Sequence, residues 1–296
     1  MRIVSELHMP EGPVILSDHS YLLVEMGPER GCVTQISADG LSKRIICQTG
    51  RPNGLAIDAH GNLWVAESNN PPSLVRLTLE GEKETVLTGC EGKPFLWPND
   101  LAFGPDDALY MTDSGITTDD LLDGDGIRSD YLDFDYQGAV FRIDPITKDI
   151  SIIDSGLKFA NGIAFGSNQS LYVNETVTGD VYRYESEGSG RFGPRQLYGN
   201  VKDPNGPDGM RGPDGMKFGK DGNLYVAVYG QGDVTVLNPS GDVVDRIKTA
   251  GKFPSNLAFG HDGENKIYVT EGEYGAFDTY DVPTDGLPLY KPTLLN

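Results

Sequence analysis

The sequence predicts an all-β protein, a six-bladed β-propeller whose blades are four-stranded antiparallel sheets. Two observations support this prediction: a short phrase recurs six times, and 38 Gly and 19 Pro are spread along 296 residues. Frequent Gly and Pro suit many short strands joined by turns better than long helices. We find no amphipathic run of ten or more residues with clear helix caps. We therefore expect residues 1–296 to form a single β-propeller domain.

The recurring phrase starts with one polar residue, here called the anchor, followed by an apolar strand such as Ile163-Ala164-Phe165. Six anchors occur at spacings of 42, 46, 62, 53 and 41 residues, and they are Glu11, Asn53, Asn99, Asn161, Asp214 and Ser255. Repeats of about 40–50 residues with strand-type patterns are typical of propeller blades. Each copy is therefore expected to supply one blade.

The strands inside each copy follow a common register. In five copies, the ninth residue after the anchor directly precedes a second apolar strand, such as Leu63-Trp64-Val65. A turn rich in Gly, Asp and Asn separates the two strands, which is typical of a hairpin. The last copy differs by an insertion at residues 263–266. A third strand and a weaker outer strand follow, and residues 2–4 are predicted to complete the last blade.

The net charge limits the kinds of molecule that we expect the protein to bind. The formal net charge of -20 repels phosphate backbones and anionic lipids, so we expect neither nucleic-acid nor membrane partners. The three cysteines have no metal-type spacing and are expected to be reduced thiols. The N-terminal residues lack an apolar signal core, and no run is long enough to span a bilayer. We expect a cytoplasmic protein.

Two insertions lengthen the regular copies. Residues 117–136 contain seven aspartates, and the stretch from Asp123 to Gly126 resembles part of a calcium loop without its full ligand spacing. This segment is either a solvated surface loop or a lid over the site. Residues 203–212 contain a second Pro-Asp-Gly phrase at Asp208. The nine-residue register selects Asp214 instead as the anchor of this copy.

The six anchors are expected to converge on the propeller axis, because the innermost strand of each blade starts there at the same face. Their side chains offer oxygen ligands and two negative charges, which suit a hard cation. Ca²⁺ is the leading candidate, and Mg²⁺, Mn²⁺, Fe²⁺ or Zn²⁺ are possible. Any single Asn-Gly pair could instead be only a turn, and Asn53 and Ser255 are assigned a structural role.

Acidic residues follow four anchors at a distance of fourteen residues, at the ends of the second strands. These acids are expected to orient the anchor amides or deepen the negative field of the site, or else to face solvent. They are Glu25, Glu67, Asp113 and Glu175.

The motifs Glu11-Gly12-Pro13, Pro98-Asn99-Asp100, Asn161-Gly162 and Pro213-Asp214-Gly215 have a familiar order and register. From about Glu11 to Tyr280 the chain resembles the regucalcin/gluconolactonase/luciferin-regenerating-enzyme family, also called the senescence-marker-protein-like family. The resemblance implies one divalent cation in the central channel and hydrolysis of a lactone or related ester. It also implies that Glu11, Asn161 and Asp214 bind the metal, that Asn99 completes the metal site or contacts substrate, and that Asp214 is the catalytic base or nucleophile.

One position departs from the family pattern. Sugar-lactonase members have an Arg two residues before the anchor of the third blade, whereas this chain has Trp97. The indole favours a flatter or more apolar substrate ring, or simply packs at the channel mouth. The expected substrate-binding residues are Asn99, Trp97 and Asp113. The alternative functions are phosphotriester hydrolysis at the same site and calcium binding without catalysis.

Overall fold

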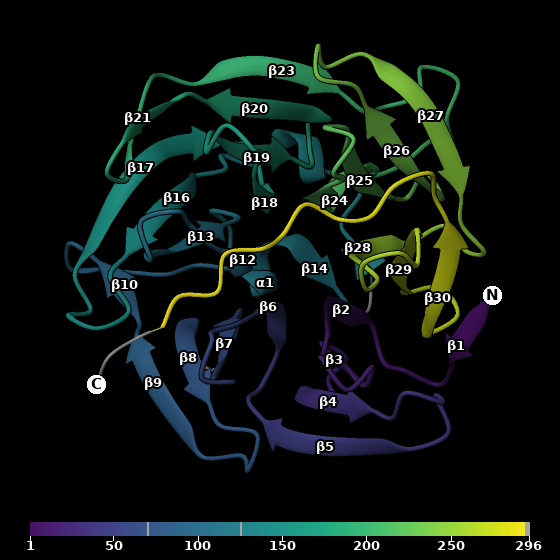
Figure 1. Cartoon of the computed structure of the whole chain (residues 1–296). Coiled ribbons are helices and arrows are strands. Elements are labelled where there is room, and N and C mark those ends of the chain that lie inside the picture. Colours follow the sequence, from purple (N-terminus) through teal and green to yellow (C-terminus); the bar gives the residue numbers. More distant parts are fainter. Residues whose placement is uncertain (70, 125, 294–296) are drawn as a thin grey trace.

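The computed structural model describes residues 1–69, 71–124 and 126–293. Six four-stranded antiparallel sheets surround a central channel, so the predicted six-bladed β-propeller is confirmed (Figure 1). From the innermost strand outward, the first three blades are β2 (Pro10–Ile15), β3 (Tyr21–Glu25), β4 (Cys32–Ile36) and β5 (Lys43–Gln48); β6 (Pro52–Ile57), β7 (Leu63–Glu67), β8 (Ser73–Leu77) and β9 (Lys83–Leu87); and β12 (Pro98–Phe103), β13 (Leu109–Asp113), β16 (Gly138–Ile143) and β17 (Ile150–Leu157).

The last three blades follow the same plan. They are β18 (Ala160–Phe165), β19 (Leu171–Glu175), β20 (Asp180–Tyr184) and β23 (Gln196–Asn200); β24 (Gly212–Phe218), β25 (Leu224–Tyr229), β26 (Asp233–Leu237) and β27 (Val243–Lys248); and β28 (Pro254–Phe259), β29 (Lys266–Glu271), β30 (Ala276–Asp281) and β1 (Arg2–Val4).

Short elements decorate this ring. The helices are one turn long or less: α1 (Thr118–Leu121) and the 3-10 helix η1 (Tyr131–Asp133). The two-stranded ribbons are β10 (Gly89–Cys90) with β11 (Lys93–Pro94), β14 (Leu122–Asp123) with β15 (Gly126–Ile127), and β21 (Ser186–Gly188) with β22 (Arg191–Phe192). Among the described residues, no helix has the length and apolar character that a membrane crossing requires.

Apolar side chains fill the space between neighbouring blades. Trp64 and Leu74 of the second blade pack with Met111 and Phe141 of the third, and all four are at most 6% exposed. The same arrangement recurs around the ring, so each blade buries both of its faces against its neighbours. The outer strands carry exposed apolar side chains, such as Leu197 and Val244, because only one of their edges is paired.

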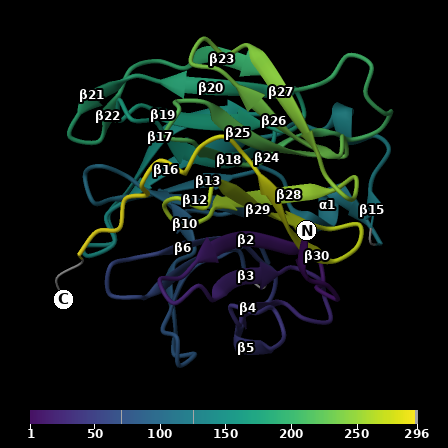
Figure 2. The same ribbon diagram turned by 45° about the vertical axis from the view of Figure 1, so that its right-hand side comes forward.

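The anchors and the C-terminal segment lie at opposite ends of the channel. Every anchor is at the start of an innermost strand, whereas residues 286–291 line a cavity of about 600 Å³ with the ends of those strands. Backbone hydrogen bonds fasten the segment to the fifth and second blades, through Leu287 N to Phe218 O and Ala59 N to Pro292 O. Figure 2 shows this yellow segment on one face and α1 with β15 toward the other.

The N-terminal strand closes the ring, as the sequence predicts. β1 pairs with β30, and Arg2 donates hydrogen bonds to both carboxylate oxygens of the buried Asp278, at 3.0 and 3.2 Å. The last blade is therefore built from both ends of the chain (Figure 1). The outer edge of β30 is covered in this way.

Deleting residues 1–4 is expected to lower the free energy of unfolding by about 3 kcal/mol, because Ile3 and Val4 lose their packing and β30 loses its partner. Urea denaturation followed by circular dichroism measures the change. Val244→Ser, on the exposed face of a complete outer strand, is the control and should change stability by less than about 0.5 kcal/mol. Equal stability of the deletion and the full chain would contradict a closing role for β1.

Candidate functional site

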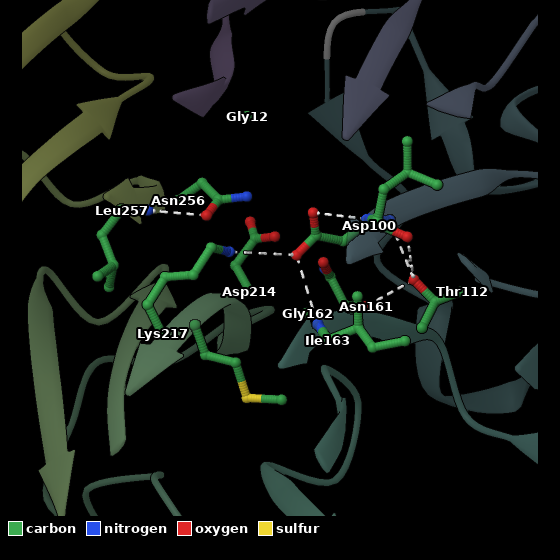
Figure 3. A network of polar contacts seen from close by, with 12 residues as sticks. Gly12, Asp100, Thr112, Asn161, Gly162, Ile163, Asp214, Lys217, Asn256 and Leu257 are labelled. Carbon is green, nitrogen blue, oxygen red and sulfur yellow. Dashed lines mark hydrogen bonds and ion pairs between the residues drawn. The ribbon is translucent and has the colours of Figure 1, made fainter. Parts of the chain in front are cut away.

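The structure brings the anchors together at one end of the channel, because neighbouring innermost strands pack side by side around the axis. Five of the anchors are at most 5% exposed, and Asp214 is half-buried. Figure 3 shows Asp214 and Asn161 pointing toward the axis with the side chains of Asp100, Lys217 and Asn256. The site is therefore a polar cluster inside an otherwise apolar propeller.

Glu11 is a buried carboxylate held by neutral donors. One of its oxygens accepts hydrogen bonds from Gly12 N at 2.5 Å and from Asn256 Nδ2 at 2.8 Å. Burial and, next, the nearby Asp100 carboxylate raise the pKa of Glu11 to about 8, and the hydrogen bonds from Asn256 and Gly12 oppose this shift. A pKa this high indicates that too little positive charge lies nearby to stabilise the ionised carboxylate.

The Asp214 carboxylate also has too little positive charge nearby. Burial, followed by the charges of Glu11 and Asp100, raises the pKa of Asp214 well above its usual range, and the Asn161 amide opposes this shift. Carboxylates from three different blades thus approach one another in a region of low dielectric. Their mutual repulsion decreases if one of them is protonated or if a cation lies between them.

Asn161 presents an unpaired carbonyl oxygen to this cluster. Its Nδ2 donates to Thr176 Oγ1 at 3.0 Å, and Thr176 in turn donates to Pro213 O at 2.8 Å. This chain fixes which end of the amide faces the protein wall. The Oδ1 atom is buried and has no hydrogen-bond partner. A buried acceptor without a donor loses about 1–3 kcal/mol of solvation, which a bound cation would recover.

Asn99 is held by the same device one blade earlier. Its Nδ2 donates to Ser114 Oγ at 2.9 Å, and Ser114 Oγ donates to Ala160 O at 3.1 Å. Both hydroxyls lie fifteen residues after their anchor. Each one therefore orients an amide and also links its blade to the next.

The sequence analysis missed three polar members of the cluster, although the repeat register contains the signal. The residue after the anchor is Gly in four copies, whereas it is Asp100 or Asn256 in the other two. The third residue after the anchor is Val or Ala in five copies, whereas it is Lys217 in the sixth. Reading every column of the repeat for such exceptions would have found all three.

The glycines of that column leave room for their neighbours. A Cβ on Gly215 would lie 2.0 Å from the Asn256 side chain, and one on Gly162 would lie 2.1 Å from Asp214 O. Glycine at these positions thus lets the polar side chains of adjacent blades approach the axis.

The net charge of the cluster would be balanced by one divalent cation. Glu11, Asp100 and Asp214 carry three negative charges when ionised, and the Lys217 ammonium, 3.9 Å from Asp100 Oδ2, compensates one of them. Two negative charges and the unpaired Asn161 carbonyl remain. This donor set fits a hard cation. No group of three or more His, Cys, Asp or Glu side chains arranged for a metal occurs in the described part of the chain, so amide oxygens would have to share the coordination.

The strand-end acids have another role. The expectation that they orient the anchor amides is wrong, because antiparallel pairing places each acid opposite the residue before the anchor. Asp113 accepts hydrogen bonds from the backbone N–H of Leu96 at 2.8 Å, Trp97 at 3.1 Å and Gly115 at 2.9 Å. Glu175 likewise accepts from Lys158 N at 2.8 Å. These carboxylates fix the segments that lead into the innermost strands.

Trp97 and residues 117–136 pack together at the channel mouth. Trp97 is 5% exposed and lies in an apolar cluster with Ile116, Leu121, Tyr136 and Phe159. The segment therefore covers one sector of the mouth with its apolar side chains. Its described aspartates are exposed, and Asp125 lies outside the described residues.

Asp113→Asn is expected to lower the free energy of unfolding by about 1–3 kcal/mol, because three backbone donors lose a charged acceptor. Urea denaturation measures the loss. Asp119→Asn, an exposed acid of the covering segment, is the control and should have no measurable effect. If Asp113→Asn kept full stability but weakened substrate binding, the positioning role would be wrong and a substrate contact would be favoured.

The metal-free protein is expected to lose stability as the pH rises from about 4.5 to about 8. In this window folded Glu11 retains a proton that the unfolded chain has released, so raising the pH favours unfolding. Melting temperatures measured after chelation over this range give the slope. Glu11→Gln should flatten it and exposed Glu29→Gln should leave it unchanged. A slope that survives in Glu11→Gln would show that other groups cause it.

Similarities to known proteins agree with this architecture. The chain is 28% identical over 281 residues to a gluconolactonase of Zymomonas mobilis, covering 88% of this chain and 76% of that protein. It is 27% identical over 312 residues to a diisopropyl-fluorophosphatase of Loligo vulgaris, covering 99% and 95%. The structure of a calcium-binding regucalcin from Agrobacterium tumefaciens has the same fold, with a TM-score of 0.74 at 14% identity over 97% of this chain and 93% of that one.

A family model covers nearly the whole propeller. The SMP-30/Gluconolactonase/LRE-like region matches residues 10–273, from the first strand of the first blade to just beyond the second strand of the last blade. The match includes all six anchors and the residues that pack around them. The chain belongs to the SMP-30/gluconolactonase/LRE-like family.

Proposed function

We propose that this protein is a divalent-cation-dependent hydrolase that opens a lactone or related ester at the anchor end of the channel. The observation that carries the proposal is the uncompensated cluster of Glu11, Asp214 and the unpaired Asn161 Oδ1. The relatives named gluconolactonase and lactonase support the reaction class. Glu11, Asn99, Asn161 and Asp214 would hold the cation, with Ca²⁺ as the leading candidate.

A divalent cation bound there would polarise the lactone carbonyl and stabilise the negative charge that develops on its oxygen. Asp214 is the half-buried member of the carboxylate group, so it remains open to a small molecule from the mouth. It would accept the proton of the attacking water. The hydroxyls of Ser114 and Thr176 would keep the two amides in their orientation through the reaction.

Two alternatives use the same residues. The relative named diisopropyl-fluorophosphatase favours phosphotriester hydrolysis as a second candidate, since the same charge stabilisation would serve a phosphoryl centre. The solved regucalcin, described as calcium-binding, motivates a third candidate, which is cation binding without catalysis. Substrate panels separate the first two, and the absence of any turnover favours the third.

Asp214→Asn is expected to lower kcat for lactone opening by about 100-fold or more, because the base is lost. Chelation should abolish activity and Ca²⁺ should restore it. The assay uses a panel of lactones, aryl esters and one phosphotriester, with Mg²⁺, Mn²⁺, Fe²⁺ and Zn²⁺ tested in parallel. In the chelated state the variant should melt higher than wild type, because one of the repelling carboxylates is gone.

Asp208→Asn is the matched control, since it makes the same change in the other Pro-Asp-Gly phrase, on an exposed loop. It should keep wild-type activity. Full lactonase activity in Asp214→Asn would exclude the proposed base. Activity that survives complete chelation would exclude a required cation.

A further inference from the structure

A second ring of side chains surrounds the mouth of the channel, one level above the anchors. It consists of the residues two positions before each anchor, here called the mouth ring: Met9, Arg51, Trp97, Phe159, Gly212 and Phe253. Five of these residues are apolar or glycine. Arg51 is the only charged member.

Neighbouring members of the mouth ring contact one another along part of its circumference. The Arg51 guanidinium carbon lies 4.5 Å from the centre of the Trp97 ring, and the Trp97 and Phe159 ring centres are 5.4 Å apart. Gly212 has no side chain, and its strand partner Tyr229 stacks on Phe253 with ring centres 4.7 Å apart. The aromatic side chains at the mouth are thus accompanied by one positively charged residue, Arg51.

The charge of Arg51 reaches a residue from the opposite side of the channel. Arg51 belongs to the second blade and Tyr229 to the fifth, so the two start from opposite sides of the axis. Burial and, next, the Asp214 charge raise the pKa of Tyr229 to about 12, and the Arg51 charge opposes this shift. Tyr229 therefore lies within electrostatic range of both Asp214 and Arg51. Burial lowers the pKa of Arg51 to about 10, so it stays charged at neutral pH.

Arg51 makes few polar contacts of its own with the fold. Arg51 is half-buried, and its guanidinium donates to Ser68 Oγ at 3.0 Å. It forms no ion pair with any described carboxylate, although the Glu67 charge is near. Glu67 Oε1 accepts from the backbone N–H of Arg51 and Asn69, whereas its Oε2 is buried without a hydrogen-bond partner. The Arg51 charge is one of the influences that lower the pKa of Glu67.

The other blades have no arginine at this position. Their strand-end acids are held by backbone N–H groups in the same way, with Met, Trp or Phe in place of Arg51. Where an arginine approaches one of these acids, it comes from elsewhere in the blade, as with Arg30 at 4.0 Å from Glu25 and Arg195 at 3.8 Å from Glu175. A cation near the acid therefore does not have to stand in the mouth ring.

We propose that Arg51 selects substrates that carry an anionic substituent on or next to the lactone ring. This inference rests on the proposed function and names its substrate class. The surrounding protein has a net charge of -20, so an anionic substrate needs a local cation to enter. The guanidinium stacked on Trp97 is fixed in orientation and has donors left for a bidentate contact with a carboxylate.

Three probes of equal shape test the charge preference. They are one γ-lactone with a carboxylate, a carboxamide or an aminomethyl group at the same ring position, assayed with the cation that restores activity. Wild type should prefer the carboxylate over the carboxamide by about tenfold or more in kcat/KM, with the aminomethyl compound worst. Arg51→Met should bring the ratio of carboxylate to carboxamide close to one. Arg51→Glu should invert the order.

Arg44→Met, which removes the same charge from an exposed outer strand, is the control and should keep the wild-type order. An equal loss on all three probes in a folded Arg51→Met variant would reduce Arg51 to a support for Trp97 and overturn the proposal. So would a wild-type enzyme without charge preference.

Calorimetric titration separates failure of this inference from failure of the proposed function. If wild type opens no lactone with any cation, the proposed function fails, and binding of the same probes still tests Arg51. Tighter binding of the carboxylate probe that disappears in Arg51→Met supports anion selection. Equal binding of the three probes by wild type and variant contradicts it.

Discussion

The repulsion between carboxylates at the axis is the constraint that organises the channel. Glu11, Asp100 and Asp214 come from three blades, and the circular arrangement leaves their strands no freedom to move apart. Burial makes each charge expensive, and the proximity of the others adds to the cost. Lys217 relieves part of this strain, and a divalent cation would relieve the rest. This cluster therefore destabilises the fold when no further positive charge compensates it.

The blades are linked at this level by small hydroxyl side chains, so the site and the fold share hydrogen bonds. Ser114 donates to Ala160 O, Thr176 to Pro213 O, and Ser255 to Pro10 O at 2.7 Å. The last of these links the sixth blade to the first. Each bond fixes the start of the next innermost strand, where an anchor is located. The precision of the oxygen cluster therefore depends on the closure of the whole ring, including β1.

The repeat made most of the fold predictable from sequence. The period, the nine-residue register and the closing strand at residues 2–4 all follow from local patterns that recur with little change. The strand-end acids show the limit of this reasoning, because Asp113 follows the pattern yet binds backbone rather than amide. The prediction missed Asp100, Asn256 and Lys217. It relied on positions at which the six copies agree, whereas these residues stand where one or two copies differ from the rest. Electrostatic interactions across the axis, such as that of Arg51 with Tyr229, leave no local pattern in the sequence.

The division of the channel mouth into two levels has a functional consequence. The anchor level contains the charges and the unpaired carbonyl on which hydrolysis would depend, and changes there disturb the closure of the ring. The mouth ring stands two residues earlier. Five of its members precede the innermost strands and can vary without loss of strand pairing, whereas Gly212 lies within β24 and pairs with Tyr229. Met, Arg, Trp, Phe and Gly all occur there in one chain, whereas the anchors are all oxygen-bearing. A propeller of this kind can therefore change its substrate through one ring while the other keeps the chemistry constant.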